Sequence, residues 1–350
     1  MPKILLVFNS EIRDEYIRND DLDRLGKFVE WQWLDLRGGA RFEANTDPDS
    51  IHRLRDNIES ADGVVICHGS PKISREMMDY APTLRIIGEL EGDRFATRID
   101  LEEAWNRGIK TLDTTNGSSY PVAEWALGLI LISVKNAGSL FRRIIKGDTG
   151  RLQKDDFGYL NGELYGKTVG LIGCGHIGRR LIQFLAPFQV ELKVYDPYIQ
   201  PEIGDILGFT RTSLENVLSG SEVIVCLAPL TPSTTGLLGK TELDLISSGS
   251  VFVNMSRGPI VDSHALINRL KKGDIVAGLD VFDPEPIPRD SDIIHLPNVF
   301  LSPHIAGVTA ASYERFFTLM VDELDLFFGG HETRFDLTVN SMNNRSGADV

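Results

Sequence analysis

Three segments of the sequence carry side chains that could bind an acid and move a proton. They are NMSRGPIVD (254–262), LDVFDPEP (279–286) and LSPHIAG (301–307). Arg257 can grip a carboxylate and a keto oxygen with its fork of N–H donors. His304, when protonated, can give a proton to that oxygen while a hydride reaches the neighbouring carbon. An acid of the second segment could hold the imidazole and favour its charged form. Together these groups suit the reduction of a 2-keto acid.

Each of these residues also has a simpler interpretation. Arg257 could be a surface charge at the start of a helix, and His304 could be a core histidine with satisfied hydrogen bonds. The acids Asp280, Asp283 and Glu285 could belong to a proline-rich turn. All three segments follow apolar runs typical of strands, and the carboxyl ends of parallel strands meet at one edge of a sheet. Their joint occurrence therefore favours a shared site.

A glycine-rich loop precedes these segments in VGLIGCGHIGRR (169–180). Gly173, Gly175 and Gly178 have the spacing G-x-G-x-x-G between a predicted strand and a predicted helix. In a dinucleotide site, such glycines permit a tight turn, a close approach to the pyrophosphate and close helix packing. Asp196, at the end of the next predicted strand, can accept hydrogen bonds from the ribose hydroxyls of NAD and would repel the extra phosphate of NADP. The loop therefore predicts an NAD site.

Short β-branched runs alternate with helical patterns along most of the chain, which predicts an α/β fold with two parallel sheets. The first strand set is 4–8, 63–67, 84–88 and 109–113, and the second is 168–173, 192–196, 222–228, 251–256, 276–281 and 299–303. We expect one long helix from about Tyr120 to Lys146 and a last helix over 310–328, which could return to pack on the first strand set. The polar end, 341–350, is expected to be frayed.

The composition excludes several classes of protein. A chain of 350 residues, of which 42% are hydrophobic, can build two domains. The formal net charge of −14 argues against nucleic acid and anionic membranes as partners. The longest apolar stretch, 122–134, contains Glu124 and is too short to span a membrane. Three widely spaced cysteines, Cys67, Cys174 and Cys226, suggest reduced thiols in a cytoplasmic protein.

The chain resembles the D-isomer-specific 2-hydroxyacid dehydrogenase family over about residues 60–330. The resemblance rests on NGSSYPVAEWALGLIL (116–131), the glycine-loop segment, CLAPLTPSTTGLL (226–238) and the three segments that open this section. It implies the catalytic trio Arg257, Glu285 and His304, with Asp196 selecting NAD and Asp280 near the nicotinamide amide. It also implies a homodimer through the 120–146 region.

The resemblance further implies two Rossmann-like domains. A flavodoxin-like substrate-binding domain would comprise 1–116, completed by 307–340, and an NAD-binding domain with a doubly wound parallel sheet would comprise 117–306. No metal is expected. The residues expected to bind NAD are Gly173, Gly175, His176, Ile177, Gly178, Asp196, Ala228, Pro229, Ser256 and Asp280.

One stretch departs from the family pattern. Members commonly carry R-A-G-x-G-x-D-N, whose backbone N–H groups help to hold the substrate carboxylate, where this chain has GELEGDRFATRID (88–100). We expect Glu91, Gly92 and Arg94 to line the substrate site, and Glu89 and Glu91 to add negative charge at its mouth. Arg94 could replace a lost anion contact, or Arg94 and Arg98 could pair with Glu91 and Asp93 at the surface. The added charge favours a compact monocarboxylate of the glyoxylate or hydroxypyruvate kind.

Two classes of function agree with these features. The first is an NAD-dependent enzyme that interconverts a D-2-hydroxy acid and its 2-keto acid. The second is an NAD-sensing binding protein or co-repressor, because the family's fold also serves in co-repressors that keep the same trio. Oxidation of NADH in the presence of 2-keto acids distinguishes the two.

Overall fold

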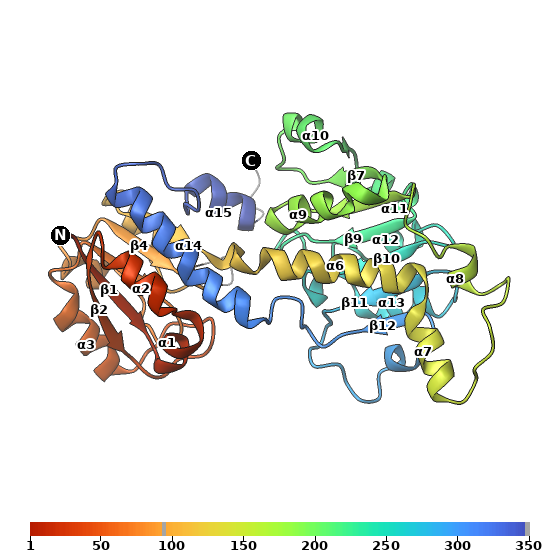
Figure 1. The fold of residues 1–350 in the computed structure, drawn as a ribbon, viewed down its shortest axis with the longest axis horizontal. Coiled ribbons are helices and arrows are strands. Elements are labelled where there is room, and N and C mark those ends of the chain that lie inside the picture. Colours follow the sequence, from red (N-terminus) through yellow and green to blue (C-terminus); the bar gives the residue numbers. More distant parts are fainter. Residues whose placement is uncertain (93–95, 347–350) are drawn as a thin grey trace. The chain divides into compact units, whose positions relative to one another are not determined.

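The computed structural model describes residues 1–92 and 96–346, which form two compact units. Unit 1 combines Met1–Ser118 with the segment from Thr309 onward, and unit 2 is Ser119–Val308. The sequence predicts domain boundaries after residues 116 and 306. In the structure each boundary lies two residues later, after Ser118 and Val308. Each unit is built around its own parallel sheet (Figure 1).

The described part of unit 1 contains a five-stranded parallel sheet of order β2-β1-β3-β4-β5. Its strands are β1 (Lys3–Phe8), β2 (Glu30–Asp35), β3 (Gly63–Ile66), β4 (Ile86–Glu89) and β5 (Lys110–Asp113). This order is the flavodoxin-like one, as predicted. The predicted strand set lacked β2, because this edge strand exposes its first three residues and has no continuous apolar run.

Helices cover both faces of this sheet. One apolar cluster joins the sheet to α1, α2 and α14, and the other joins it to α3, α4 and α5. Figure 1 shows α14 in blue beside the red first strands, although 300 residues separate them in sequence. The elements are α1 (Ser10–Tyr16), α2 (Asn19–Leu25), α3 (Pro48–Ile58), α4 (Arg75–Asp79), α5 (Leu101–Asn106), the 3₁₀ turn η1 (Thr115–Ser118), α14 (Ala310–Phe328) and α15 (Val339–Ser346).

The expectation of a frayed end was wrong for residues 341–346. These residues belong to α15, at whose start the Thr338 hydroxyl accepts from Ser341 N at 3.1 Å. Met342 packs against the unit 1 core, and Arg345 Nη1 donates to Asp113 Oδ2 at 2.7 Å. The packing of Met342 and the ion pair of Arg345 thus help to hold a polar segment that has no helical apolar stripe. Residues 347–350 lie outside the described residues.

In its described residues unit 2 contains a seven-stranded parallel sheet of order β12-β11-β10-β9-β6-β7-β8. The strand order reverses at β6, from which β7 lies on one side and β9 on the other. This reversal places the loop after β6 at the position where doubly wound sheets bind ligands. The strands are β6 (Thr168–Ile172), β7 (Glu191–Tyr195), β8 (Thr210–Arg211), β9 (Val223–Cys226), β10 (Val251–Asn254), β11 (Val276–Leu279) and β12 (Val299–Leu301).

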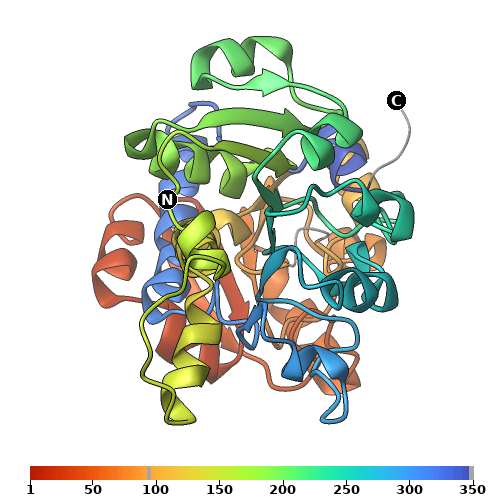
Figure 2. The same ribbon diagram turned by 90° about the vertical axis from the view of Figure 1, so that its right-hand side faces the viewer.

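Two helix layers sandwich this sheet. The first apolar cluster contains side chains of α6 and α9, and the second contains those of α11, α12 and α13. Figure 2 shows yellow helices on one side and teal helices on the other. The elements are α6 (Ser119–Val134), α7 (Ala137–Ile145), α8 (Phe157–Leu160), α9 (His176–Leu185), η2 (Ala186–Phe188), α10 (Pro201–Leu207), α11 (Leu214–Ser219), α12 (Lys240–Asp244), η3 (Gly258–Ile260), α13 (Ser263–Leu270) and η4 (Asp292–His295).

The single helix expected from about Tyr120 to Lys146 is instead two helices. Asn136 has a left-handed backbone (φ 46°), a conformation that asparagine tolerates better than most residues, and it ends the run between α6 and α7. The carbonyl of Lys135 also lies so close to Gly158 that a Cβ there would meet it at 2.2 Å. The apolar pattern continues across the break, although in α7 the large apolar side chains of Phe141, Ile144 and Ile145 are exposed.

The segment Thr115–Val134 is long and apolar enough to cross a membrane by length and composition alone. However, 56% of its 18-residue apolar window is buried inside the structure. Fully buried residues such as Ala126, Leu129 and Ile130 pack against the sheet of unit 2. A helix that is apolar on all sides and buried in this way is a core helix.

Candidate active site and cofactor loop

A side chain at any of the three glycines after β6 would either clash with neighbouring backbone or fill the open space beside the loop. Gly173 has a left-handed backbone (φ 95°), and a Cβ there would lie 2.8 Å from Ala228 N. A Cβ on Gly178 would lie 2.9 Å from the Gly173 carbonyl, so this glycine lets α9 pack against the loop. Gly175 is different, because a Cβ there would meet nothing within 4 Å. The open space beside Gly175, at the start of α9, fits a pyrophosphate.

Asp196 lies at the end of β7 and holds the glycine loop. Its Oδ2 accepts from Cys174 N at 2.8 Å, and its Oδ1 accepts from Tyr198 N at 2.9 Å. Each carboxylate oxygen has a second lone pair, so the ribose hydroxyls of NAD can still be accepted. Asp196 therefore shapes the glycine loop, and its selection of NAD over NADP stays a prediction.

The loops after β9 and β10 meet the glycine loop. Ala228 contacts Gly173, and its carbonyl accepts a hydrogen bond from the Ser256 hydroxyl. Ser256 is positioned in turn by Asn254, whose side chain accepts from Ser256 N at 3.1 Å. Pro229 fixes the next turn, because its carbonyl accepts from Thr234 Oγ1 at 2.6 Å. Three of the predicted cofactor residues are thus brought together at the carboxyl edge of the sheet, and the residues present fit NAD.

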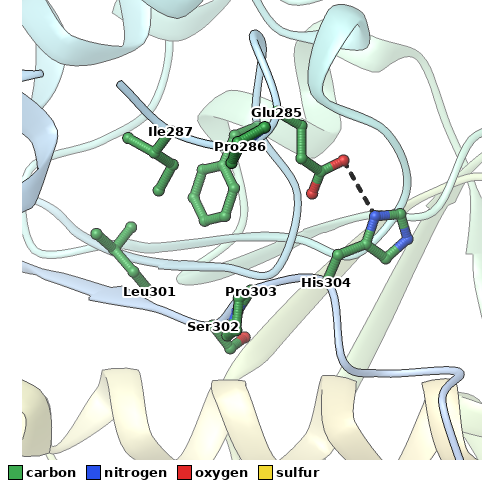
Figure 3. A pocket seen from close by; sticks show the side chains of 8 residues that line it. Glu285, Pro286, Ile287, Leu301, Ser302, Pro303 and His304 are labelled. Atoms are coloured by element: carbon green, nitrogen blue, oxygen red, sulfur yellow. Dashed lines mark hydrogen bonds and ion pairs between the residues drawn. The ribbon is translucent and has the colours of Figure 1, made fainter. Parts of the chain in front are cut away.

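The predicted acid and histidine form a direct pair. His304 Nδ1 lies 3.1 Å from Glu285 Oε2, and both side chains are more than a third exposed. Figure 3 shows the other ring nitrogen, Nε2, pointing away from Glu285. A pocket of about 400 Å³ lies on the Glu285 side of the ring and is lined by Phe282, Glu285, Pro286, Ile287, Leu301, Ser302, Pro303 and His304. The carboxylate can thus orient the imidazole while Nε2 stays available for a proton transfer.

Asp280 holds the loop that carries His304. Its buried Oδ1 accepts from Ser302 Oγ at 2.6 Å and from Ile305 N at 3.1 Å, and its Oδ2 accepts from Ala306 N at 3.1 Å. Trp125 Nε1, from α6, also donates to Oδ1 at 3.3 Å. These contacts stabilise His304 in a left-handed backbone (φ 53°), which is uncommon for residues other than glycine. The family resemblance implied a nicotinamide contact for Asp280, and this stays a prediction.

Arg257 follows β10 and is half-buried, and its Nη1 donates to the Ser256 carbonyl at 2.9 Å. The next residue explains how the arginine loop meets the acid loop. A Cβ on Gly258 would lie 1.6 Å from the Phe282 carbonyl, so only glycine allows the two loops to touch. Ser263 Oγ adds a hydrogen bond to the Asp283 carbonyl at 2.6 Å. Arg257, Glu285 and His304 therefore come from three loops at one edge of the unit 2 sheet.

The expectation that Glu89 adds negative charge at the mouth of the site was wrong. Glu89 is the last residue of β4, and its side chain is fully buried and paired with Arg98, which is also fully buried. Arg98 therefore does not pair with Glu91 at the surface either. Burial raises the pKa of Glu89 above its ordinary value, and the charge of Arg98 opposes that shift. Arg94 and Asp93 lie outside the described residues.

Glu91 is also buried and is satisfied by three side chains of unit 1. Its Oε1 accepts from Arg41 Nη2 at 2.8 Å, and its Oε2 accepts from Tyr16 OH at 2.6 Å. His68 Nε2 lies 3.0 Å from Oε2, close enough for an ion pair although its angle is poor for a hydrogen bond. Burial alone would raise the pKa of Glu91, but the contacts from His68 and Tyr16 and the charge of Arg41 lower it to about 2.

Sequence reasoning missed several residues that build these sites. Trp125 and Gly258 lie inside the motifs quoted from the sequence. The glycine directly after Arg257 was a signal that the backbone there approaches another segment too closely for a side chain. Arg41, His68 and Tyr16 come from three separate loops and helices of unit 1, so no local pattern links them to Glu91. Among the described residues, no group of three or more His, Cys, Asp or Glu is arranged to hold a metal ion.

We expect Asp196→Ala to weaken binding of NADH and to narrow the preference for NAD over NADP, since the variant loses both the negative charge and the anchor of the loop. Asp196→Asn keeps an acceptor for Cys174 N, so it should narrow the preference while losing less affinity. Calorimetric titration measures both effects, and Asp205→Ala, an exposed acid on α10, is the control. Tighter binding of NADP than of NAD by the wild type would contradict this role.

Glu91 makes a pH-dependent contribution to stability. The pKa of about 2 is lower than the roughly 4.3 of an unfolded chain. The contribution is therefore present above about pH 4.3 and is lost as the pH falls toward 2. We expect Glu91→Gln to lower the melting temperature at pH 7 and the difference from wild type to shrink by pH 3. The exposed Glu15→Gln serves as the control, and a constant difference would exclude the ionised contact.

Comparison with curated proteins finds relatives of two kinds. The chain is 34% identical over 281 residues to the glyoxylate reductase of Thermofilum pendens, covering 78% of this chain and 80% of that protein. It is 31% identical over 273 residues to the D-3-phosphoglycerate dehydrogenase of Methanocaldococcus jannaschii, covering 77% of this chain. The chain spans about half the length, 50%, of that second relative.

Solved structures share the fold. A phosphoglycerate oxidoreductase from Rhizobium etli matches with a TM-score of 0.81 at 24% identity, covering 96% of this chain and 98% of the other. D-lactate dehydrogenase with NAD⁺ from Lactobacillus jensenii matches with a TM-score of 0.71 at 23% identity, covering 96% and 99%. The family model described as D-isomer specific 2-hydroxyacid dehydrogenase, NAD binding domain, matches residues 127–306. With the glycine loop, the acid after β7 and the histidine–glutamate pair in place, the chain belongs to the D-isomer-specific 2-hydroxyacid dehydrogenases, enzymes that use NAD.

Proposed function

We propose that this enzyme interconverts a small D-2-hydroxy acid and its 2-keto acid, with glyoxylate or hydroxypyruvate as the first candidates. The observation that carries the proposal is the contact between His304 Nδ1 and Glu285 Oε2 at 3.1 Å. The loop that carries Glu285 also meets the arginine loop within unit 2, where Gly258 lies against Phe282. A histidine held by a carboxylate beside an arginine is the arrangement that reduction of a keto group needs.

In the proposed reaction, each side chain of the trio has a separate task. Bound NADH supplies the hydride. His304 Nε2 donates a proton to the keto oxygen, and Glu285 keeps the ring oriented through Nδ1. Arg257 binds the carboxylate and polarises the carbonyl through its N–H donors. In the opposite direction the neutral His304 accepts the proton of the hydroxy acid.

The preference for a compact substrate is now supported by the relatives alone. Those named glyoxylate reductase reach 34% identity and are matched over most of their length. The charge argument from the 88–100 stretch no longer holds, because Glu89 is paired with Arg98 and Glu91 with Arg41. Hydroxypyruvate and glyoxylate therefore stand as the first compounds to test, beside dicarboxylate and phosphorylated keto acids.

His304→Ala should lower kcat by roughly a hundredfold or more, the scale of a lost general acid. Arg257→Ala should raise KM and also lower kcat, because both binding and polarisation are lost. NADH oxidation with a panel of 2-keto acids measures both, and His295→Ala, an exposed histidine of the same unit, is the control. NADH binding should survive in each variant. Near-normal turnover by His304→Ala would mean that another group donates the proton.

We also propose a homodimer formed through the 120–146 region, with no nucleic acid or membrane as partner. The support is the outer face of α7, where Phe141, Ile144 and Ile145 are 65%, 59% and 70% exposed. Three large apolar side chains on one short helix are typical of an interface. The three cysteines are buried, which agrees with reduced thiols in a cytoplasmic enzyme.

Phe141→Glu combined with Ile145→Glu should convert the dimer into a monomer, because two charges would have to be buried in the interface. Sedimentation velocity gives the mass. The matched control is Ile206→Glu on α10, which changes an even more exposed isoleucine, at 77%, outside this region. A wild-type monomer, or a dimer that survives the double change, would refute the assignment.

A further inference from the structure

The indole of Trp125 lies where α6 meets the loop after β12, residues 302–308, which carries the histidine. Its Nε1 donates to Ser302 Oγ at 3.0 Å and to Asp280 Oδ1 at 3.3 Å. Ser302 Oγ in turn donates to Asp280 Oδ1 at 2.6 Å, so the three side chains form one closed set of hydrogen bonds. Because an indole N–H is a donor only, it can orient these two acceptors and cannot take a proton from them.

The ring of Trp125 is fixed by packing within unit 2. Phe300 of β12 meets it edge to face, with the ring centres 6.5 Å apart. Three residues further along α6, a Cβ on Gly128 would lie 3.2 Å from Trp125 Cε3, so a larger residue there would crowd the ring. The side chain is half-buried and packs against the apolar cluster between α6 and the sheet. The position of the N–H is therefore set by α6 and by the sheet.

The two acceptors of this N–H hold the backbone of His304 on both sides. Ser302 lies two residues before the histidine, and its carbonyl accepts from His304 N at 3.0 Å. The carbonyl of Asp280 accepts from the same N–H at 2.9 Å. The carboxylate of Asp280 accepts from Ile305 N and Ala306 N, each at 3.1 Å. A shift of either acceptor would therefore move the imidazole, whose residue has a left-handed backbone with a φ of 53°.

We propose that Trp125 is a positioning residue for the proton transfer. It acts on His304 through the two acceptors of its N–H. In the orientation that results, Glu285 contacts Nδ1 and the other ring nitrogen, Nε2, points away from this acid (Figure 3). The inference rests on the proposed function, because it takes His304 as the proton donor. It gives α6 a part in the reaction beside its place in the core.

The direct test is Trp125→Phe, which keeps an aromatic ring and removes the N–H. Asp280 Oδ1 retains Ser302 Oγ and Ile305 N as donors, so the variant should fold. We expect kcat for NADH-dependent reduction of glyoxylate or hydroxypyruvate to fall roughly 10-fold, since a displacement of about 1 Å can cost up to a hundredfold. KM for the keto acid and Kd for NADH should stay near wild type, because Arg257 and the glycine loop are unchanged.

Trp105→Phe is the matched control. This indole, on α5 of unit 1, also donates to two acceptors, Thr111 Oγ1 and the Leu337 carbonyl, both at 3.0 Å. The control should lower the melting temperature and leave kcat unchanged. Ser302→Ala is a second variant, which removes the hydroxyl that accepts from Trp125. It should lower kcat in the same way, and it provides the same readout if Trp125→Phe does not fold.

A double-mutant cycle with His304→Ala separates positioning from a general structural role. If the indole acts through His304, Trp125→Phe should lower kcat in the wild-type background and leave the residual kcat of His304→Ala unchanged. Equal losses in both backgrounds, an unchanged kcat in Trp125→Phe, or an equal fall in Trp105→Phe would overturn the proposal. Failure of the proposed function would look different, because the wild type would reduce no 2-keto acid or His304→Ala would turn over normally.

Discussion

The carboxylate of Asp280 is the interaction on which the catalytic edge of unit 2 depends. It is 1% exposed and accepts hydrogen bonds from Ser302, Trp125 and the backbone after His304. A buried carboxylate is costly unless donors surround it, and here the donors come from Ser302 directly after β12, from Trp125 of α6 and from the backbone after His304. Satisfying one charge thus fixes three elements together. The left-handed backbone of His304 is stable because these contacts hold it on both sides.

Unit 1 uses buried charge in a similar way. Arg98 and Glu91 have little or no exposed surface, and each binds groups from several loops. Removing one partner of the Arg98–Glu89 or the Arg41–Glu91 ion pair would leave an uncompensated charge inside the protein, so both partners are needed together. Arg98 thus ties the 41–43 segment to the end of β4 through hydrogen bonds to its carbonyls, while the side chain of Arg41 is half-exposed.

Some parts of both units could be predicted from local patterns. The glycine spacing predicted Gly173, Gly175 and Gly178 in the roles that their surroundings now explain, since backbone conformation and close approach are properties of single residues. Edge strand β2 and helix α15 were missed, because one lacks an apolar run and the other is held by Met342 and Arg345 rather than by its own pattern. The break at Asn136 was also missed, because apolar residues continue on both sides of it.

The sequence by itself determined the alternation of strands and helices, the NAD loop and the order of the arginine, acid and histidine segments. These features depend on residue type and spacing along the chain, which a single sequence contains in full. Only the tertiary structure decided that Glu89 is buried against Arg98 and that Glu91 is held by Tyr16, His68 and Arg41. The charge of a residue does not show whether its side chain is exposed or buried. Burial of Glu91 depends on contacts with residues that are far away in the sequence, such as Tyr16.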